Sequence, residues 1–306
     1  MKNIYKIQLI ILLCLALSSC SVIGVLQSHK EVKGDYITEL VPIDKDPVYD
    51  MSINVIQGIA SFENGWFTSQ TSKSRFLLIN YLNEKGESVF HKRLLINSHG
   101  QDLSLEQVSE NKLYLYTTAG HFDEENVSYM VRIVVDLPEK INGKRDMSKL
   151  QINLDEKYPL NLTNCTPTLS EDKKHFAIRS ANSIIVATKE DVLKNDLSNA
   201  TKFNLDASQL IGKNNEPLWF QGIAMKDGLI YCMTGNNSIG SIKLLYVYNL
   251  KGEVVQKHVI DKDKFAMQLK KKLEPEGITF KDGDLYYTIM LKGGTGGNRK
   301  FLFKYR

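Results

Sequence analysis

The chain has 306 residues, of which 42% are hydrophobic and 24% are charged, and its formal net charge is +4. This length and apolar content are enough for one large core or two modest ones, which excludes a disordered chain. The net charge falls to +2 without Lys2 and Lys6, and the other basic residues are interspersed with acidic ones, so a nucleic-acid-binding protein is not expected.

The first residues have the pattern of a secretory signal. Lys2 and Lys6 precede an apolar run at 7–17, in which Gln8 is the only polar residue. A basic start followed by an apolar segment of this length is typical of a signal peptide and is short for a membrane-spanning helix. The pattern predicts export of the chain.

The end of this segment, Leu17-Ser18-Ser19-Cys20, resembles the bacterial lipobox, in which the cysteine is acylated and becomes the first mature residue. We therefore expect residues 1–19 to be removed, Cys20 to carry the lipid, and 20–34 to form a tether. Several acyl chains would hold the protein to the outer face of the bacterial cell membrane. The alternative is an ordinary cleaved signal in which Cys20 is a chance cysteine.

The first and fourth repeat units have the clearest pattern. Gln57-Gly58-Ile59-Ala60 and Gln221-Gly222-Ile223-Ala224 each open a series of short β-branched and aromatic runs. Turns rich in Gly, Asn, Asp and Ser separate these runs about every ten residues, which is typical of antiparallel strands. The two units also share a Lys-Gly-Glu turn, so the pattern predicts a repeated four-stranded meander.

The second and third units are weaker repeats. The second opens at Leu105-Glu106-Gln107-Val108 and has a polar insertion at 136–149 before its last strand. The third opens near 165–168, and 190–195 predicts a short helical turn before its last strand. The two cysteines after Cys20, Cys165 and Cys232, fall in different units. Export would permit a disulfide, but Cys232 lies in an apolar strand-like run, so we expect two free thiols. There is no CxxC or nearby histidine pair to indicate zinc.

The fifth unit, 276–305, is one strand short, whereas the strand-like segment 35–43 has no partner nearby. Closure of a ring by this N-terminal segment would complete the last unit and protect its edge. Five such units predict an all-β fold, a five-bladed β-propeller spanning 35–306. A six-bladed ring is the alternative.

Two segments carry a resemblance to known families, namely 98–106, with the sequence SHGQDLSLE, and 273–278, with the sequence LEPEGI. With the polar-Gly-Ile-Ala openings, they are similar to the helveticin J family, to teichoic acid biosynthesis protein C and to phage receptor-binding propellers. The resemblance covers 55–306. It implies a secreted or surface-attached five-bladed propeller that is associated with cell-wall polymers or bacteriocin activity, without an agreed catalytic mechanism.

The unit openings suggest a binding site on the axis of the ring. We expect Gln57, Glu106, Gln221 and Glu276 to face the central channel, where they could take a cation such as calcium or a hydroxyl-rich sugar. The alternative is that they only solvate a water-filled channel. His99 and Asp102 precede the second unit and could orient a sugar or bind a metal, or they could be structural.

The function that follows is binding, with no assigned catalytic residue and no required cofactor. We expect a cell-surface lipoprotein whose propeller binds a teichoic-acid-like envelope glycopolymer or a partner protein. The alternative is a metal-dependent propeller hydrolase or lactonase, which Glu274-Pro275-Glu276-Gly277 also resembles. Glu106 and Glu276 form the best carboxylate pair for glycoside hydrolysis, although a pair drawn from 35 acidic residues is weak evidence.

Overall fold

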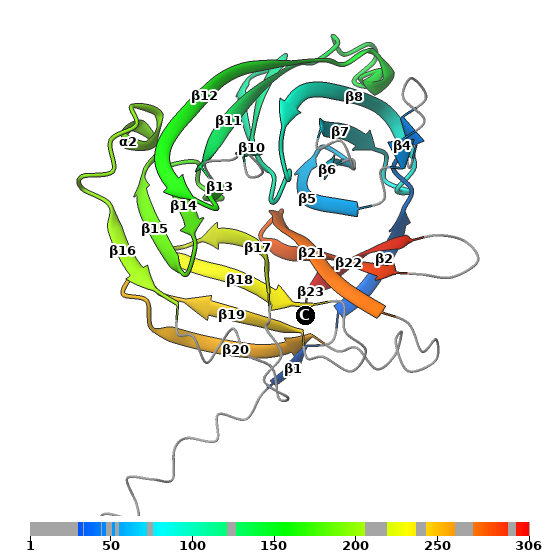
Figure 1. Ribbon diagram of the computed structural model, residues 1–306. Coiled ribbons are helices and arrows are strands. Elements are labelled where there is room, and N and C mark those ends of the chain that lie inside the picture. The colour runs from blue at the N-terminus through cyan, green and yellow to red at the C-terminus, as the bar shows by residue number, and fades with distance from the viewer. Residues whose placement is uncertain are drawn as a thin grey trace, which may run out of the picture. The chain divides into compact units, whose positions relative to one another are not determined.

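The described residues form five β-sheets around a central axis in a computed structural model (Figure 1). The structure describes residues 30–32, 34–43, 45–46, 51–52, 55–71, 76–120, 127–205, 219–236, 243–260, 272–292 and 298–305. All of them except Lys30 belong to one compact unit, Glu31–Arg306. The five-bladed β-propeller predicted from the sequence is confirmed, and the six-bladed alternative is wrong. The signal segment and Cys20 lie outside the described residues.

Each blade is an antiparallel sheet whose first strand lies nearest the axis. Blade 1 is β5 (Val55–Phe62), β6 (Gly65–Thr71), β7 (Phe76–Leu82) and β8 (Ser88–Asn97). Blade 2 is β9 (Ser104–Ser109), β10 (Lys112–Ala119), β11 (Val127–Asp136) and β12 (Gln151–Thr163). Blade 3 is β13 (Thr166–Leu169), β14 (His175–Ser180), β15 (Ser183–Thr188) and β16 (Thr201–Asn204).

The last two blades each include a strand from the N-terminal part of the chain. Blade 4 is β17 (Trp219–Lys226), β18 (Leu229–Gly235), β19 (Leu244–Tyr248) and β20 (Val254–Ile260), with β1 (Lys30–Val32) at its outer edge. Blade 5 is β21 (Lys272–Lys281), β22 (Asp284–Lys292), β23 (Arg299–Tyr305) and β2 (Gly34–Leu40). The strands β3 (Lys45–Asp46) and β4 (Met51–Ser52) form a separate two-stranded sheet.

Two short helical segments accompany the sheets, η1 (Met147–Lys149) and α2 (Lys189–Leu193). The helical turn predicted at 190–195 is α2. It begins directly after Thr188, whose side chain accepts a hydrogen bond from the Asp191 amide and so caps the first turn. None of the helices in the described part of the chain has the length and apolar character needed to cross a membrane.

The hydrophobic core is divided among the five interfaces between adjacent blades. Five separate clusters of buried side chains lie between blades 1 and 2, 2 and 3, 3 and 4, 4 and 5, and 5 and 1. The two faces of a blade therefore pack against different neighbours, which explains why the strands are apolar on both faces. Cys165 and Cys232 are buried free thiols in two of these clusters, and burial raises the pKa of Cys165 to about 12.

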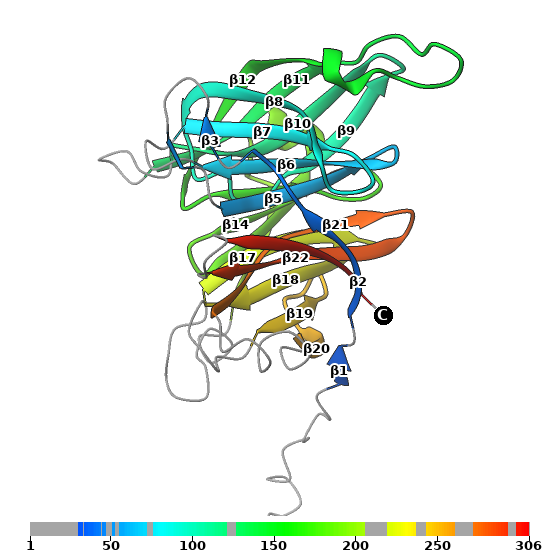
Figure 2. The same ribbon diagram turned by 90° about the vertical axis from the view of Figure 1, so that its right-hand side faces the viewer.

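The ring closes where β2 pairs with β23 (Figure 2). The ladder runs antiparallel from Gly34 opposite Tyr305 to Leu40 opposite Lys300. Leu40 is 1% exposed and belongs to the cluster between blades 5 and 1. The predicted closing strand at 35–43 is thus confirmed, with bounds at Gly34 and Leu40.

Glycine is required where the innermost strands meet at the axis. A Cβ atom on Gly58 would lie 2.4 Å from the carbonyl carbon of Asp102 in blade 2. A Cβ on Gly222 would lie 2.8 Å from the Glu276 carbonyl oxygen, and one on Gly277 would lie 2.9 Å from the Ile59 amide nitrogen. Real Cβ atoms do not approach backbone this closely, so the repeated glycine allows neighbouring blades to come together.

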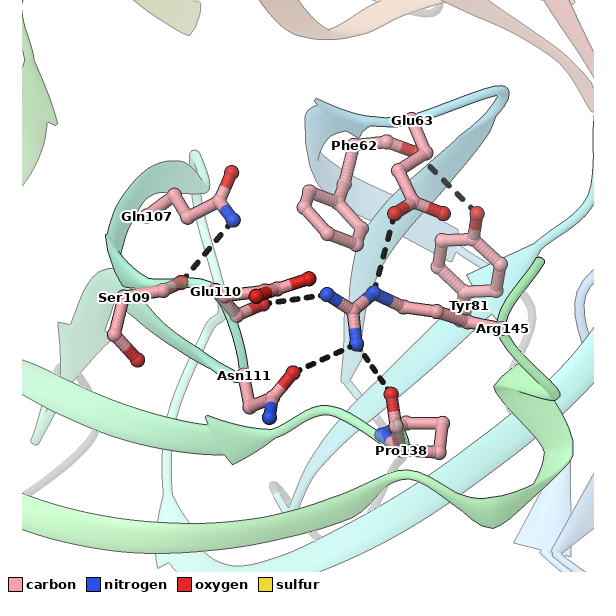
Figure 3. Close-up of polar contacts among 9 residues, drawn as sticks. All are labelled: Phe62, Glu63, Tyr81, Gln107, Ser109, Glu110, Asn111, Pro138 and Arg145. Carbon is pink, nitrogen blue, oxygen red and sulfur yellow. Dashed lines mark hydrogen bonds and ion pairs between the residues drawn. The ribbon is translucent and has the colours of Figure 1, made fainter. Parts of the chain in front are cut away.

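The insertion between β11 and β12 is held by one buried arginine (Figure 3). Arg145, whose side chain is 1% exposed, donates from Nε to Glu63 in the β5–β6 turn at 3.3 Å. Its terminal nitrogens donate to the Asn111 side chain at 3.0 Å, to the Glu110 carbonyl at 2.6 Å and to the Pro138 carbonyl. The guanidinium fork therefore joins the predicted insertion to turns of blades 1 and 2.

Gly58→Ala should destabilise the propeller by roughly 4 kcal/mol or more, because the added methyl group meets backbone that cannot move without separating two blades. Gly143→Ala is the control. Gly143 has a φ of +76° but open space around its Cβ position, so alanine there should cost only about 1–2 kcal/mol of backbone strain. Urea unfolding measures both, and equal losses would contradict the role assigned to close approach.

Leu40→Ala should lower the free energy of unfolding by about 2–4 kcal/mol, because it removes apolar packing from the interface that closes the ring. Glu39→Ala, one residue earlier, removes an exposed ion pair with Arg299 and should cost less than about 1 kcal/mol. Thermal unfolding of the two variants tests closure. A Leu40→Ala protein as stable as the wild type would show that β2 does not hold the ring.

Candidate functional site

A cavity lined by residues from all five blades lies on the axis, at the face where the innermost strands begin. Its volume is about 620 Å³, whereas the cavity at the opposite ends of these strands has only about 60 Å³. We call the larger one the axial pocket. Its walls consist of Val55, Gln57, Thr71, His99, Gln101, Asn164, Arg179, Ala181, Asn182, Leu205, Trp219, Phe220, Gln221, Glu274, Glu276 and Lys292.

β-Bulges place three of the polar residues in the axial pocket. The pairing of β5 with β6 shifts between Ile56 and Gly58, so Gln57 has no partner across the ladder. The pairing of β17 with β18 shifts in the same way and omits Gln221, and that of β21 with β22 shifts across Glu276. A bulge re-aims the side chain of the extra residue. The polar-Gly openings seen in the sequence are therefore bulges that turn polar groups toward the axis.

In blade 2 the equivalent position is Gln101, not Glu106. Gln101 lines the axial pocket, and the next residue, Asp102, donates its backbone N–H to the Gln57 carbonyl at 3.2 Å. Asp102 lies where blades 1, 4 and 5 have glycine and has a φ of +61°, which aspartate tolerates better than most residues. The opening of the second unit therefore lies five residues before Glu106, at Gln101.

Glu106 accordingly lies outside the axial pocket, and its predicted position is wrong. Its carboxylate pairs with Lys189 Nζ at 2.6 Å and accepts a hydrogen bond from the Tyr116 hydroxyl at 3.0 Å. Glu106 lies within β9, whereas Gln101 precedes that strand and lines the pocket. Glu106 and Glu276 therefore do not form the carboxylate pair that glycoside hydrolysis would need.

Two carboxyl groups of β21 form one wall of the axial pocket. Glu276 is 2% exposed, and Lys292 from β22 forms an ion pair with the neighbouring Glu274. Burial, reinforced by the charge of Glu274, raises the pKa of Glu276 well above its ordinary value, and Lys292 offsets only part of this. One of the two carboxyl groups is thus poorly neutralised by the protein.

Arginine and aromatic side chains form another wall of the axial pocket. Arg179 of β14 lies over the Phe220 ring at 4.7 Å, and its Nε donates to the Ala181 carbonyl at 2.9 Å. Burial lowers the pKa of Arg179, and no carboxylate among the described residues pairs with it. Trp219, which is 53% exposed at the start of β17, adds an open aromatic surface.

The two residues predicted ahead of the second unit have different positions. His99 lines the axial pocket beside Gln101. Asp102 is fully buried, and burial raises the pKa of its carboxyl group, an effect that the Leu103 amide and the Thr168 side chain partly offset. Asp102 therefore lies beneath the pocket, at the close approach of blades 1 and 2.

No three His, Cys, Asp or Glu side chains in the described ranges converge as a metal site would require. The axial pocket instead combines a carboxyl pair, an arginine, amides and an exposed tryptophan, which suits a polar ligand with an apolar face. Sequence reasoning missed Gln101, Arg179, Trp219 and Lys292. Only Gln101 had a signal, because Gln101-Asp102-Leu103 has the polar-x-apolar order of the other openings.

A family described as "Phage 5-bladed beta propeller receptor binding platform domain" matches residues 58–299. Among solved structures, the tail fiber of Staphylococcus aureus phage P68 is similar, with a TM-score of 0.61 and 19% identity over 90% of this chain and 52% of that one. The exo-β-1,3-galactanase from Phanerochaete chrysosporium gives a TM-score of 0.50 and 8% identity over 88% of this chain and 63% of that one. The chain thus spans about half of the tail fiber, and no curated protein matches. At these identities the structural likeness shows the fold alone.

Glu276→Gln should flatten the pH dependence of stability. Because the folded protein holds the Glu276 proton more tightly than the unfolded chain, the wild type loses stability as the pH rises above the ordinary value of 4.5 toward the raised pKa. The variant has no such proton, so its stability relative to the wild type should be greater near about pH 8 than near about pH 5. Melting curves across this range test the effect, with Glu106→Gln as the control outside the pocket. Parallel curves for Glu276→Gln and the wild type would refute it.

Proposed function

The chain belongs to the family of phage five-bladed β-propeller receptor-binding platform domains, and from this membership we propose that its propeller binds a receptor on a cell surface. The receptor is a cell-envelope glycopolymer of the teichoic-acid kind, and the axial pocket is where it binds. Glu276, Gln57, Gln221 and His99 contact the polymer there, together with Gln101 and Arg179.

The observation that carries this proposal is the composition of the axial pocket. Its volume of about 620 Å³ holds one or two sugar-sized units, and its walls offer amide and carboxyl groups that can hydrogen-bond to hydroxyl groups. Trp219 supplies a flat apolar surface at the opening, on which the face of a sugar ring can pack. A glycopolymer needs this combination of stacking and hydrogen bonding.

A lipid anchor at Cys20 is the second part of the proposal. The Leu-Ser-Ser-Cys motif supports it, and the anchor would hold the propeller on the outer face of the membrane of the bacterium that makes it. A propeller that stays there meets the cell's own envelope polymers first. Such a location argues against the freely diffusing bacteriocin implied by the helveticin J resemblance.

Two other functions have less support. A protein receptor would need a partner surface, and no feature of the axial pocket favours one over a polymer. For a hydrolase, the family gives no support, and Glu274 and Glu276 lie two residues apart on one strand instead of on opposite sides of a bond to be cleaved. Binding to a protein becomes an outcome of the experiment below.

Trp219→Ala should weaken binding of the purified mature protein to isolated cell-wall glycopolymer by roughly fivefold, because it removes one stacking surface. The control is Ile141→Ala, which removes an apolar side chain that is 73% exposed in the insertion between β11 and β12. Co-sedimentation with the polymer measures both variants. Unchanged binding by Trp219→Ala would contradict a glycopolymer site in the axial pocket. So would a wild-type protein that binds an envelope protein and not the polymer.

Cys20→Ala should abolish incorporation of a fatty-acid probe and release the protein from the membrane fraction or leave it unprocessed, because the thiol that would carry the lipid is gone. Cys14→Ala, within the apolar run, should leave labelling unchanged. Metabolic labelling followed by membrane fractionation tests both. A wild-type protein that takes up no label would refute the anchor.

A further inference from the structure

The three glutamines of the axial pocket all direct their amide nitrogens at protein acceptors. Gln57 Nε2 donates to Glu276 at 3.5 Å, and Gln221 Nε2 donates to Glu274 at 3.3 Å and to the Gly235 carbonyl at 3.2 Å. Gln101 Nε2 donates to the Phe220 carbonyl at 2.8 Å, which joins blade 2 to blade 4. The amide oxygens of these residues accept no hydrogen bond from the described residues, so they can accept one from a ligand.

The carboxyl pair adds further acceptors to the same side of the pocket. Glu276 Oε1 is buried and has no hydrogen-bond partner among the described residues. The ammonium group of Lys292 pairs with Glu274, so two adjacent carboxyl groups share one cation from the protein. A buried acceptor without a donor is costly, and a ligand that brings a donor would relieve that cost.

Arg179 gives another part of the pocket the opposite character. A guanidinium has five N–H groups and no acceptor, and only the bond from Arg179 Nε to the Ala181 carbonyl uses one of them among the described residues. The stacked Phe220 ring fixes the plane of the fork. A partly buried guanidinium in this position favours an anion such as a phosphate group.

We propose that the axial pocket recognises a zwitterionic unit of the glycopolymer, with a phosphate bound by Arg179 and an ammonium group bound by Glu276 and the amide oxygens of Gln57 and Gln221. This inference rests on the proposed function and makes it more specific. An ammonium group has three donors and no acceptor, which matches a wall made of acceptors. A plain polyol phosphate would satisfy Arg179 but would bring no donor to Glu276 Oε1, and it could not balance the second negative charge that the carboxyl pair gains when Glu276 ionises.

The pH dependence of binding follows from the same contacts. Among the described residues, the charged or titratable groups that line the pocket with Glu276 are Glu274, Lys292, His99 and Arg179. Burial raises the pKa of Glu276, and a bound ammonium group would favour its ionised form. The affinity for an ammonium-bearing ligand should therefore rise with pH relative to that for a matched ligand without the amine.

The first test uses two small probes that share a phosphate, phosphoethanolamine and glycerol 3-phosphate, titrated into the mature protein by calorimetry or ligand-observed NMR. Phosphoethanolamine should bind about tenfold more tightly, and the ratio of the two affinities should rise with pH. Glu276→Gln should bring the ratio close to one. Arg179→Gln should weaken both probes, whereas Glu106→Gln, a carboxylate outside the pocket, should change neither.

Equal affinity for the two probes, a preference that survives in Glu276→Gln, or no detectable binding of either probe would overturn the proposal.

The second test distinguishes failure of the ammonium site from failure of the proposed function. It uses isolated cell-wall glycopolymer before and after N-acetylation of its amino groups. Loss of binding on acetylation is the expected result. Equal binding before and after would refute the ammonium site and leave the glycopolymer function standing. Failure of the wild type to bind the untreated polymer would refute the function itself.

Discussion

The close approach of the innermost strands at the axis is the constraint on which the rest of the structure depends. Gly58, Gly222 and Gly277 bring backbones of neighbouring blades so near that a single methyl group would not fit. These contacts lie between blades 1 and 2, 4 and 5, and 5 and 1, and they let the apolar clusters at those three interfaces form. Cavities remain at the two ends of the axis, and of these two only the axial pocket is large enough for a sugar-sized ligand.

The same positions connect packing to function. The bulges that contain Gln57, Gln221 and Glu276 lie immediately before the axial glycines, so the backbone shape that lets blades meet also turns polar side chains toward the pocket. Blade 2 reaches this geometry with Asp102 in place of glycine, at a positive φ and with a buried carboxyl group.

Most of the fold could be predicted from the sequence, because residues close together in the chain specify the strands and turns of each repeat unit. The polar-Gly-Ile openings, the turn residues and the unpaired N-terminal strand specify strands, blade number and ring closure, and these predictions hold because a blade is a meander of neighbours in sequence. The candidate site was predictable only where the repeat is regular. Gln57, Gln221 and Glu276 reach the axial pocket as expected, whereas Glu106 does not. Blade 2 has aspartate where the pattern has glycine, so its opening at Gln101, five residues before Glu106, was not identified.

The sequence by itself determined an all-β repeat protein of five units, because turns and strand periodicity depend on residues close together in the chain. The export signal and the lipobox stay predictions from the sequence. Only the tertiary structure decided which side chains share the pocket. Arg179 belongs to a second strand, Lys292 ends another, and Trp219 precedes an opening, so nothing in their local sequence marks them. They meet because the ring brings residues more than a hundred positions apart to one end of its axis, and the balance of donor and acceptor groups that suggests a ligand exists only once they are together.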